Sequence, residues 1–240
     1  MNETMIEHTA KAYDRELETL GRKIAEMGGI AEKMLSDSID ALIELDEALG
    51  RATAAVDPRL DALQREVEEA AVQIIAKRQP MAIDLREIIG AIRISADLER
   101  VGDLAKNIAR RAVKLAGERR LPRAMVGLRH MGEVACLHLK EVLDAYSKRD
   151  IEAAREVWLR DRELDDLNDS VFRDLLTFMM EDPRNIGFCT HLLFCSKNIE
   201  RAGDHATNIA ETVHYVVTGG TLPVERPKGG EDNDSGGARA

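Results

Sequence analysis

The strongest constraint on the fold of this chain is a ten-residue segment that occurs twice. The first copy, ERVGDLAKNI, covers 99–108, and the second, ERAGDHATNI, covers 200–209. Seven of the ten residues are identical, and each recurs 101 positions later (99 to 200). Self-similarity at a fixed spacing is typical of a structural unit that is used twice. The chain is therefore expected to consist of two similar halves.

Both copies lie in segments with helical periodicity. Apolar residues are spaced by three and four positions from Leu98 to Leu115 around the first copy, and the second copy repeats this spacing. Such a pattern predicts an amphipathic helix with its apolar stripe toward the core. Glu99 and Asp103 are one turn apart on the opposite side, so we expect them to face away from the core. Gly102 and its counterpart in the second copy are expected to permit close approach of a neighbouring helix.

The rest of the chain extends this helical pattern. The first half predicts helices over about 13–49, 57–77 and 81–116, with a possible kink at Gly28-Gly29. The composition is 44% hydrophobic but only 3% aromatic, and its abundant alanine, leucine and glutamate favour helix. We predict an all-α fold of two tandem homologous three-helix bundles, six helices in all. Their predicted ranges are 8–118 and 121–218, followed by a disordered tail at 219–240, because 226–240 has no valine, leucine, isoleucine or aromatic residue.

Each half also contains a D-x-x-x-D segment, at Asp57 and Asp61 and, 104 positions later (57 to 161), at Asp161 and Asp165. Carboxylates one turn apart repel each other on an isolated helix. A cation between them would remove this repulsion and create a site with hard oxygen ligands. The repeated acidic residues are therefore candidate metal ligands.

Two simpler explanations compete with metal binding. The repeated acidic residues could form a solvated face with Arg100 and Lys106 as counterions. Asp57, which precedes a proline, could instead be a helix N-cap. The residues before Asp161 already have a helical pattern, so capping is not expected there.

An enzymatic site is not indicated. The chain has no G-x-S-x-G, G-x-x-x-x-G-K-[ST] or G-x-G-x-x-G motif. Glu211-x-x-His214 matches half of a ferritin-like carboxylate oxidase site, but the pair is not repeated in the first half. His205 could be a solvent-facing residue or a peripheral metal ligand. Three cysteines without a C-x-x-C motif indicate neither a disulfide framework nor a zinc knuckle, and fit a reducing compartment.

The net charge of −10 disfavours a nucleic-acid-binding surface. Without a run of 18 apolar residues or a signal-peptide pattern at the start, the chain is expected to be cytoplasmic with no transmembrane segment. One basic cluster lies near the junction of the halves. It is either a solvated helix end or a docking patch for an acidic partner, and its residues are Arg110, Arg111, Lys114, Arg119, Arg120 and Arg123.

The doubled E-R-x-G-D-x-A-x-N-I signature, the D-x-x-x-D segments and the junction Gln79-Pro80…Asp84-Leu85-Arg86 resemble the PhoU family of phosphate-uptake regulators. The resemblance covers about 5–219. It implies that each repeat is a three-helix bundle, and that the two acidic motifs can carry multinuclear metal clusters, as in some members. Carried over to this chain, the ligands would be Asp57, Asp61, Glu99 and Asp103 in one site and Asp161, Asp165, Glu200 and Asp204 in the other.

The same resemblance implies a function. The chain would be a non-enzymatic, cytoplasmic, homodimeric regulator that couples the ATPase subunit of a phosphate ABC transporter to a sensor histidine kinase and represses the phosphate-starvation response. Oxygen-only ligation suits Fe, Mn, Mg or another hard divalent cation rather than Zn. Two alternatives stay open: a carboxylate-bridged metal-dependent oxidase or metal storage protein, and a metal-free helical adaptor whose acidic faces bind a basic partner.

Overall fold

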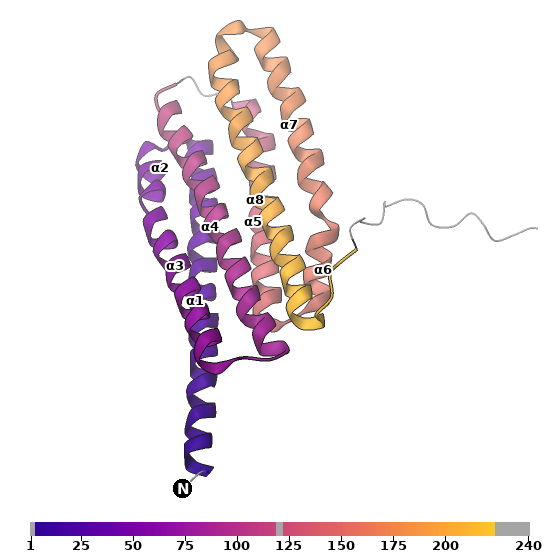
Figure 1. Cartoon of the computed structure of the whole chain (residues 1–240). Coiled ribbons are helices and arrows are strands. Elements are labelled where there is room, and N and C mark those ends of the chain that lie inside the picture. Colours follow the sequence, from indigo (N-terminus) through magenta and orange to yellow (C-terminus); the bar gives the residue numbers. More distant parts are fainter. Residues whose placement is uncertain (1–2, 119–121, 224–240) are drawn as a thin grey trace, which may run out of the picture.

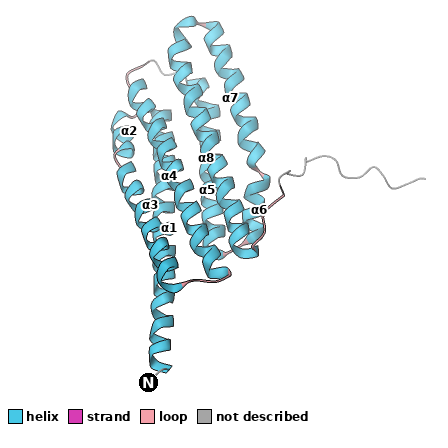
Figure 2. Cartoon of the chain, viewed as in Figure 1, coloured by secondary structure: helices cyan, strands magenta, loops and turns pink. Residues whose placement is uncertain are grey.

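The computed structural model describes residues 3–118 and 122–223, and these contain helices and no strand (Figure 2). Six long helices form two equivalent sets of three, which confirms the predicted all-α fold. Each set also contains a short helix, which precedes the middle one of its three long helices. The first half contains α1 (Glu3–Glu44), α2 (Glu47–Ala54), α3 (Asp57–Arg78) and α4 (Ile83–Leu115). The second contains α5 (Pro122–Lys148), α6 (Ile151–Leu159), α7 (Asp161–Glu181), a 3₁₀ turn η1 (Pro183–Asn185) and α8 (Ile186–Thr218).

The two halves lie side by side, with α4 and α8 adjacent at the centre (Figure 1). Helices α1 and α5 also contact each other, so the main contacts between the halves join equivalent helices. Helix α3 packs against α1 and α4 at one edge, and α7 packs against α5 and α8 at the other. Contact between equivalent helices is what an internal two-fold relation produces.

Two glycines show this relation in detail. A Cβ added at Gly28 of α1 would lie 3.0 Å from a methyl of Leu143 on α5. Its counterpart Gly132 on α5 faces Ile39 on α1, with a Cβ distance of 2.8 Å. On each helix, the glycine thus packs against a large aliphatic side chain of the other helix. The possible kink at Gly28-Gly29 is not needed, and α1 continues through both residues as one helix.

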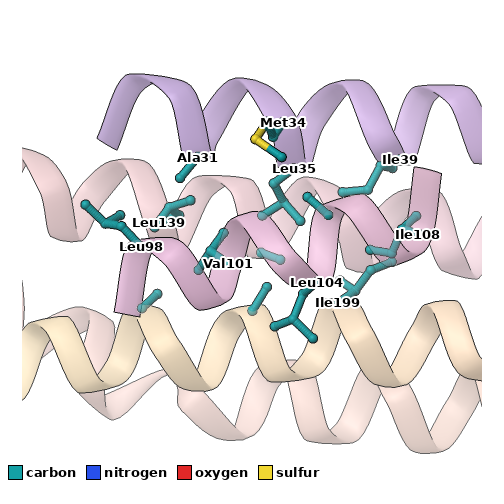
Figure 3. Packing of buried hydrophobic residues seen from close by; sticks show 14 of the residues in the cluster. Ala31, Met34, Leu35, Ile39, Leu98, Val101, Leu104, Ile108, Leu139 and Ile199 are labelled. Carbon is teal, nitrogen blue, oxygen red and sulfur yellow. The ribbon is translucent and has the colours of Figure 1, made fainter. Parts of the chain in front are cut away.

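One hydrophobic core extends through both halves. Its centre is α4, whose apolar side chains lie between those of α1 and α8 (Figure 3). Leu98, Val101 and Ile108, which the periodicity places inward, are fully buried. The core is built almost entirely from aliphatic side chains, because the chain has few aromatic ones.

The predicted end of the first helix near residue 49 is wrong, since α1 ends at Glu44. Leu45 has a φ of 55°, and Asp46 caps α2 by accepting a hydrogen bond from the Leu49 backbone N–H at 3.0 Å. The second half has the same turn, with φ 54° at Arg149. The sequence does not indicate these helix ends, because the left-handed conformation is disfavoured for both leucine and arginine.

Within residues 3–118 and 122–223, no helix is long and apolar enough to cross a membrane. Most of the tail that was predicted to be disordered, residues 224–240, lies outside the described residues. Arg119 and Arg120 of the basic cluster also lie outside them.

Candidate functional site

The repeated acidic residues of the first half come together where α3 packs against α4, and we name this group the first acidic cluster. Asp57 and Asp61 occupy the first turns of α3, and Glu99 and Asp103 lie on α4. Gly102 permits this arrangement, because a Cβ at that position would lie only 2.3 Å from a Leu60 methyl on α3; this confirms the predicted close approach. The second acidic cluster, of Asp161, Asp165, Glu200 and Asp204, has the same arrangement between α7 and α8, where Gly203 receives Leu164 at 2.2 Å.

The two glutamates are less exposed than their place on the helical wheel predicts. Glu200 is buried, and the Glu99 side chain is only 15% exposed. The carboxylates were predicted to face away from the core, but this side of α4 and α8 is covered by α3 and α7, so both glutamates are shielded from solvent. A periodicity argument treats each helix alone and does not include a third helix.

Helix capping does not explain the aspartates. Asp57 is the first residue of α3, after an N-cap at Val56 that makes no side-chain capping bond. Asp161 is likewise the first residue of α7, after an N-cap at Arg160. The expectation that a continuous helix precedes Asp161 is wrong, since α6 ends at Leu159. Both aspartates therefore sit at matching helix N-termini, where a carboxylate is favoured by the helix dipole.

An ammonium group lies inside the first acidic cluster. Lys106 Nζ is 2.8 Å from Asp57 Oδ2 and 2.5 Å from Asp103 Oδ1, so it joins α3 to α4. Its side chain is only 16% exposed. Burial lowers the pKa of Lys106, but the hydrogen bonds to the two carboxylates outweigh this and raise it overall. Arg100 is 62% exposed and lies farther out, 3.4 Å from Glu99.

The second acidic cluster has a hydroxyl where the first has the ammonium. Thr207 takes the place of Lys106 in the repeat, and its Oγ1 donates a hydrogen bond to Asp161 Oδ1 at 2.7 Å. Lys197 pairs with Glu200 at 2.5 Å, but its side chain is 58% exposed. This lysine approaches from the solvent side and joins residues of one helix only.

Carboxylates crowd each other in both clusters. Burial raises the pKa of Glu99, and the charge of Asp103 adds to the rise. Burial also raises the pKa of Asp165 and of Asp204, with neighbouring carboxylates adding to each. Burial and neighbouring negative charge thus both disfavour the ionised form of these carboxyl groups.

The two acidic clusters differ in how well their side chains fit a metal ion. As the side chains lie in residues 3–118 and 122–223, no group of three or more histidine, cysteine or acidic residues is arranged to hold one. The second cluster offers only oxygen donors and a hydroxyl, which suit a hard cation after side-chain rotation. The first cluster does not fit a cation while Lys106 stands between Asp57 and Asp103.

Two further polar groups differ from the sequence expectations. The His205 side chain is largely buried and contacts the other half of the chain. Its Nδ1 lies 2.9 Å from Asp97 Oδ1 on α4, and it is 18% exposed. Asn208 donates a second hydrogen bond to the same oxygen at 3.3 Å. Asp97 was not predicted as a site residue, because the residue 101 positions later is an asparagine and the repeat does not mark it.

Both residues of the partial oxidase motif, Glu211 and His214, make contacts within the protein. Glu211 accepts a hydrogen bond from Trp158 Nε1 at 3.1 Å, and His214 Nδ1 lies 3.3 Å from the Gly220 carbonyl oxygen. In the basic cluster, the Arg111 guanidinium stacks over the Phe194 ring at 4.3 Å. Glu211, His214 and Arg111 thus each have a partner within the protein.

Two acidic three-helix units, related by a repeat and sharing one core, define this chain as a duplicated helical scaffold. A family model described as the PhoU domain matches residues 24–112 and again 128–213. The chain belongs to the PhoU family.

Relatives and solved structures agree with this assignment. A Rhizobium meliloti (strain 1021) protein named "Phosphate-specific transport system accessory protein PhoU homolog" is 56% identical over 222 residues, which are 92% of this chain and 93% of the relative. The protein of the same name from Caulobacter vibrioides (strain NA1000 / CB15N) is 49% identical over 93% of this chain and 97% of the relative. The crystal structure of PhoU from Pseudomonas aeruginosa, 39% identical, has a TM-score of 0.84 over 87% of this chain and 100% of that one. The crystal structure of PhoU from Streptococcus pneumoniae, 24% identical, has the same fold with a TM-score of 0.81.

Proposed function

We propose that this chain is a non-enzymatic regulator of phosphate uptake that acts in the cytoplasm. In this proposal it couples the ATPase subunit of a phosphate ABC transporter to a sensor histidine kinase and represses the phosphate-starvation response. The observation that carries the proposal is the 56% identity, over nearly the whole chain, to a relative named as an accessory protein of phosphate-specific transport.

The side chains support a scaffold rather than a catalyst. The three thiols are poor nucleophiles, because burial raises the pKa of Cys136 and Cys195 to about 12 and also raises that of Cys189. The acidic clusters pair with lysines and a threonine hydroxyl, which is an arrangement for binding cations or basic groups.

The regulatory role is tested by disrupting the gene in its own bacterium and measuring a reporter for a phosphate-starvation promoter in high phosphate. We expect the reporter to become active and to be silenced again by the wild-type gene. A reporter that stays silent without the gene would contradict repression. Binding of the purified chain to the ATPase subunit and to the cytoplasmic part of the kinase, measured by fluorescence anisotropy, tests the coupling. Light scattering tests the homodimer, with an expected mass of twice 26.7 kDa.

We also propose that a divalent cation such as Mn²⁺, Fe²⁺ or Mg²⁺ binds in the second acidic cluster. Metal analysis of protein purified without chelator separates this from the alternative functions. Bound metal without oxygen consumption supports a structural or regulatory cation. Oxygen consumption on addition of Fe²⁺ would favour an oxidase or storage protein, and absence of metal would favour the metal-free adaptor.

A further inference from the structure

The two copies of the signature differ at three positions, and one of these lies within the acidic clusters. The eighth residue of the signature is Lys106 in the first copy and Thr207 in the second. All four carboxylate positions are the same in both clusters. The pair is therefore an internal comparison, in which one backbone arrangement carries an ammonium in one copy and a neutral hydroxyl in the other.

Lys106 is placed as a cation ligated by the first cluster would be. Its Nζ contacts one carboxylate from each helix, at 2.8 Å from Asp57 and 2.5 Å from Asp103. Both partners are shielded, with side-chain exposures of 11% and 32%. Charge-assisted hydrogen bonds of this kind are among the stronger polar contacts in proteins. The lysine thus holds α3 to α4 and places a positive charge among the carboxylates.

The second cluster has a hydroxyl instead of an ammonium at the equivalent position. Thr207 donates one hydrogen bond to Asp161 and brings no charge, and its oxygen could itself coordinate a hard cation. The nearby ammonium of Lys197 contacts only Glu200, on its own helix, and is 58% exposed. Because it is attached one turn away and largely solvated, it can leave the carboxylate at little cost.

We infer that Lys106 is the resident cation of the first acidic cluster, so that a divalent cation binds only in the second. The inference rests on the proposed cation binding at the second cluster. It differs from the expectation that both acidic motifs carry metal. The lysine then supplies one permanent positive charge to the first cluster, whereas the positive charge at the second depends on the concentration of free cation.

The test uses the full chain, stripped with chelator and titrated with MnCl₂ by isothermal calorimetry. Wild type is expected to bind Mn²⁺ at one cluster. Asp204→Asn should abolish this binding and Asp103→Asn should leave it unchanged. Lys106→Thr, which copies the second repeat, should add a second set of sites, so that the number of ions bound per chain about doubles. The reciprocal Thr207→Lys should abolish binding.

Thermal melts with and without Mn²⁺ check that each variant is folded and give a second readout. Without metal, Lys106→Thr should melt below wild type, because four crowded carboxylates lose their cation, and Mn²⁺ should restore the loss. Lys197→Ala is the matched control. It removes the solvent-exposed ammonium, and should leave the number of bound ions unchanged.

The outcomes separate the two proposals. Loss of wild-type binding on Asp103→Asn, or an unchanged number of ions in Lys106→Thr, would overturn the role of Lys106. If wild type binds no Mn²⁺ but Lys106→Thr does, the lysine is the excluding group and the proposed site in the second cluster is wrong. If no variant binds Mn²⁺, both proposals are refuted.

Discussion

The close approach of Gly102 on α4 to Leu60 on α3, beside the first acidic cluster, gives a quantitative prediction. A methyl group added at Gly102 would stand 2.3 Å from Leu60 Cδ2 and 3.8 Å from Met34 Cε. Leu60 is 1% exposed, so it has no free space into which to turn. Gly102→Ala must therefore push α3 away from α4 or force Leu60 out of its rotamer.

The expected magnitude is the difference between two effects. Overpacking a well-filled core costs about 1–3 kcal/mol. Alanine in place of glycine inside a helix returns about 0.5–1 kcal/mol. The two ranges differ by about 0 to 2.5 kcal/mol, so Gly102→Ala should destabilise the protein by about 1 kcal/mol. For a chain of this length this lowers the melting temperature by a few degrees.

Urea denaturation with a matched control tests this prediction. Gly29 lies in the middle of α1, and a Cβ there would meet no atom within 4 Å, so Gly29→Ala should stabilise the protein by about 0.5–1 kcal/mol. Gly203→Ala, with its contact to Leu164, should behave like Gly102→Ala. If Gly102→Ala raises the urea midpoint as Gly29→Ala does, the close approach is not what the glycine provides.

Three other perturbations should have defined directions. Burial lowers the pKa of His138. The unfolded chain then binds the proton first, so stability is lost as the pH falls through about 6.5. His138→Met, which copies the first repeat, should weaken the dependence of the urea midpoint on pH between 7.5 and 5.5, and an unchanged slope would refute it. Asp97→Ala removes the hydrogen bond to His205 between the halves, and should cost about 1 kcal/mol in urea unfolding; a variant as stable as wild type would speak against that bond. The pKa of Cys195, raised by burial to about 12, predicts negligible reaction with a thiol reagent at pH 8 in native protein and full reaction in guanidinium, with rapid native labelling as the contrary result.

The repeat made much of the fold predictable. The 101-residue spacing pairs Glu99 with Glu200 and Gly102 with Gly203, and both pairs occupy equivalent places. Helical periodicity correctly placed Leu98, and it did so from local information alone.

Three features that the sequence did not predict have a common physical cause, because each depends on a part of the chain that is distant in sequence. The burial of Glu200 requires α7 above it, and the position of Lys106 requires Asp57, which is 49 residues away. The contact of Asp97 with His205 crosses from one half to the other, and neither residue has an equivalent in the repeat. The end of α1 is set by a left-handed residue that propensity disfavours.

The joining of the halves through equivalent helices, α1 with α5 and α4 with α8, has an evolutionary consequence. A single ancestral half could have closed the same seam by pairing with an identical copy of itself. In such a symmetric pair, any mutation appears on both sides at once, and the two acidic clusters must stay alike. Fusion into one chain removes this constraint, so that one cluster has Lys106 and the other has Thr207. Gene duplication thereby allows one scaffold to carry an ammonium on one flank and a neutral hydroxyl on the other.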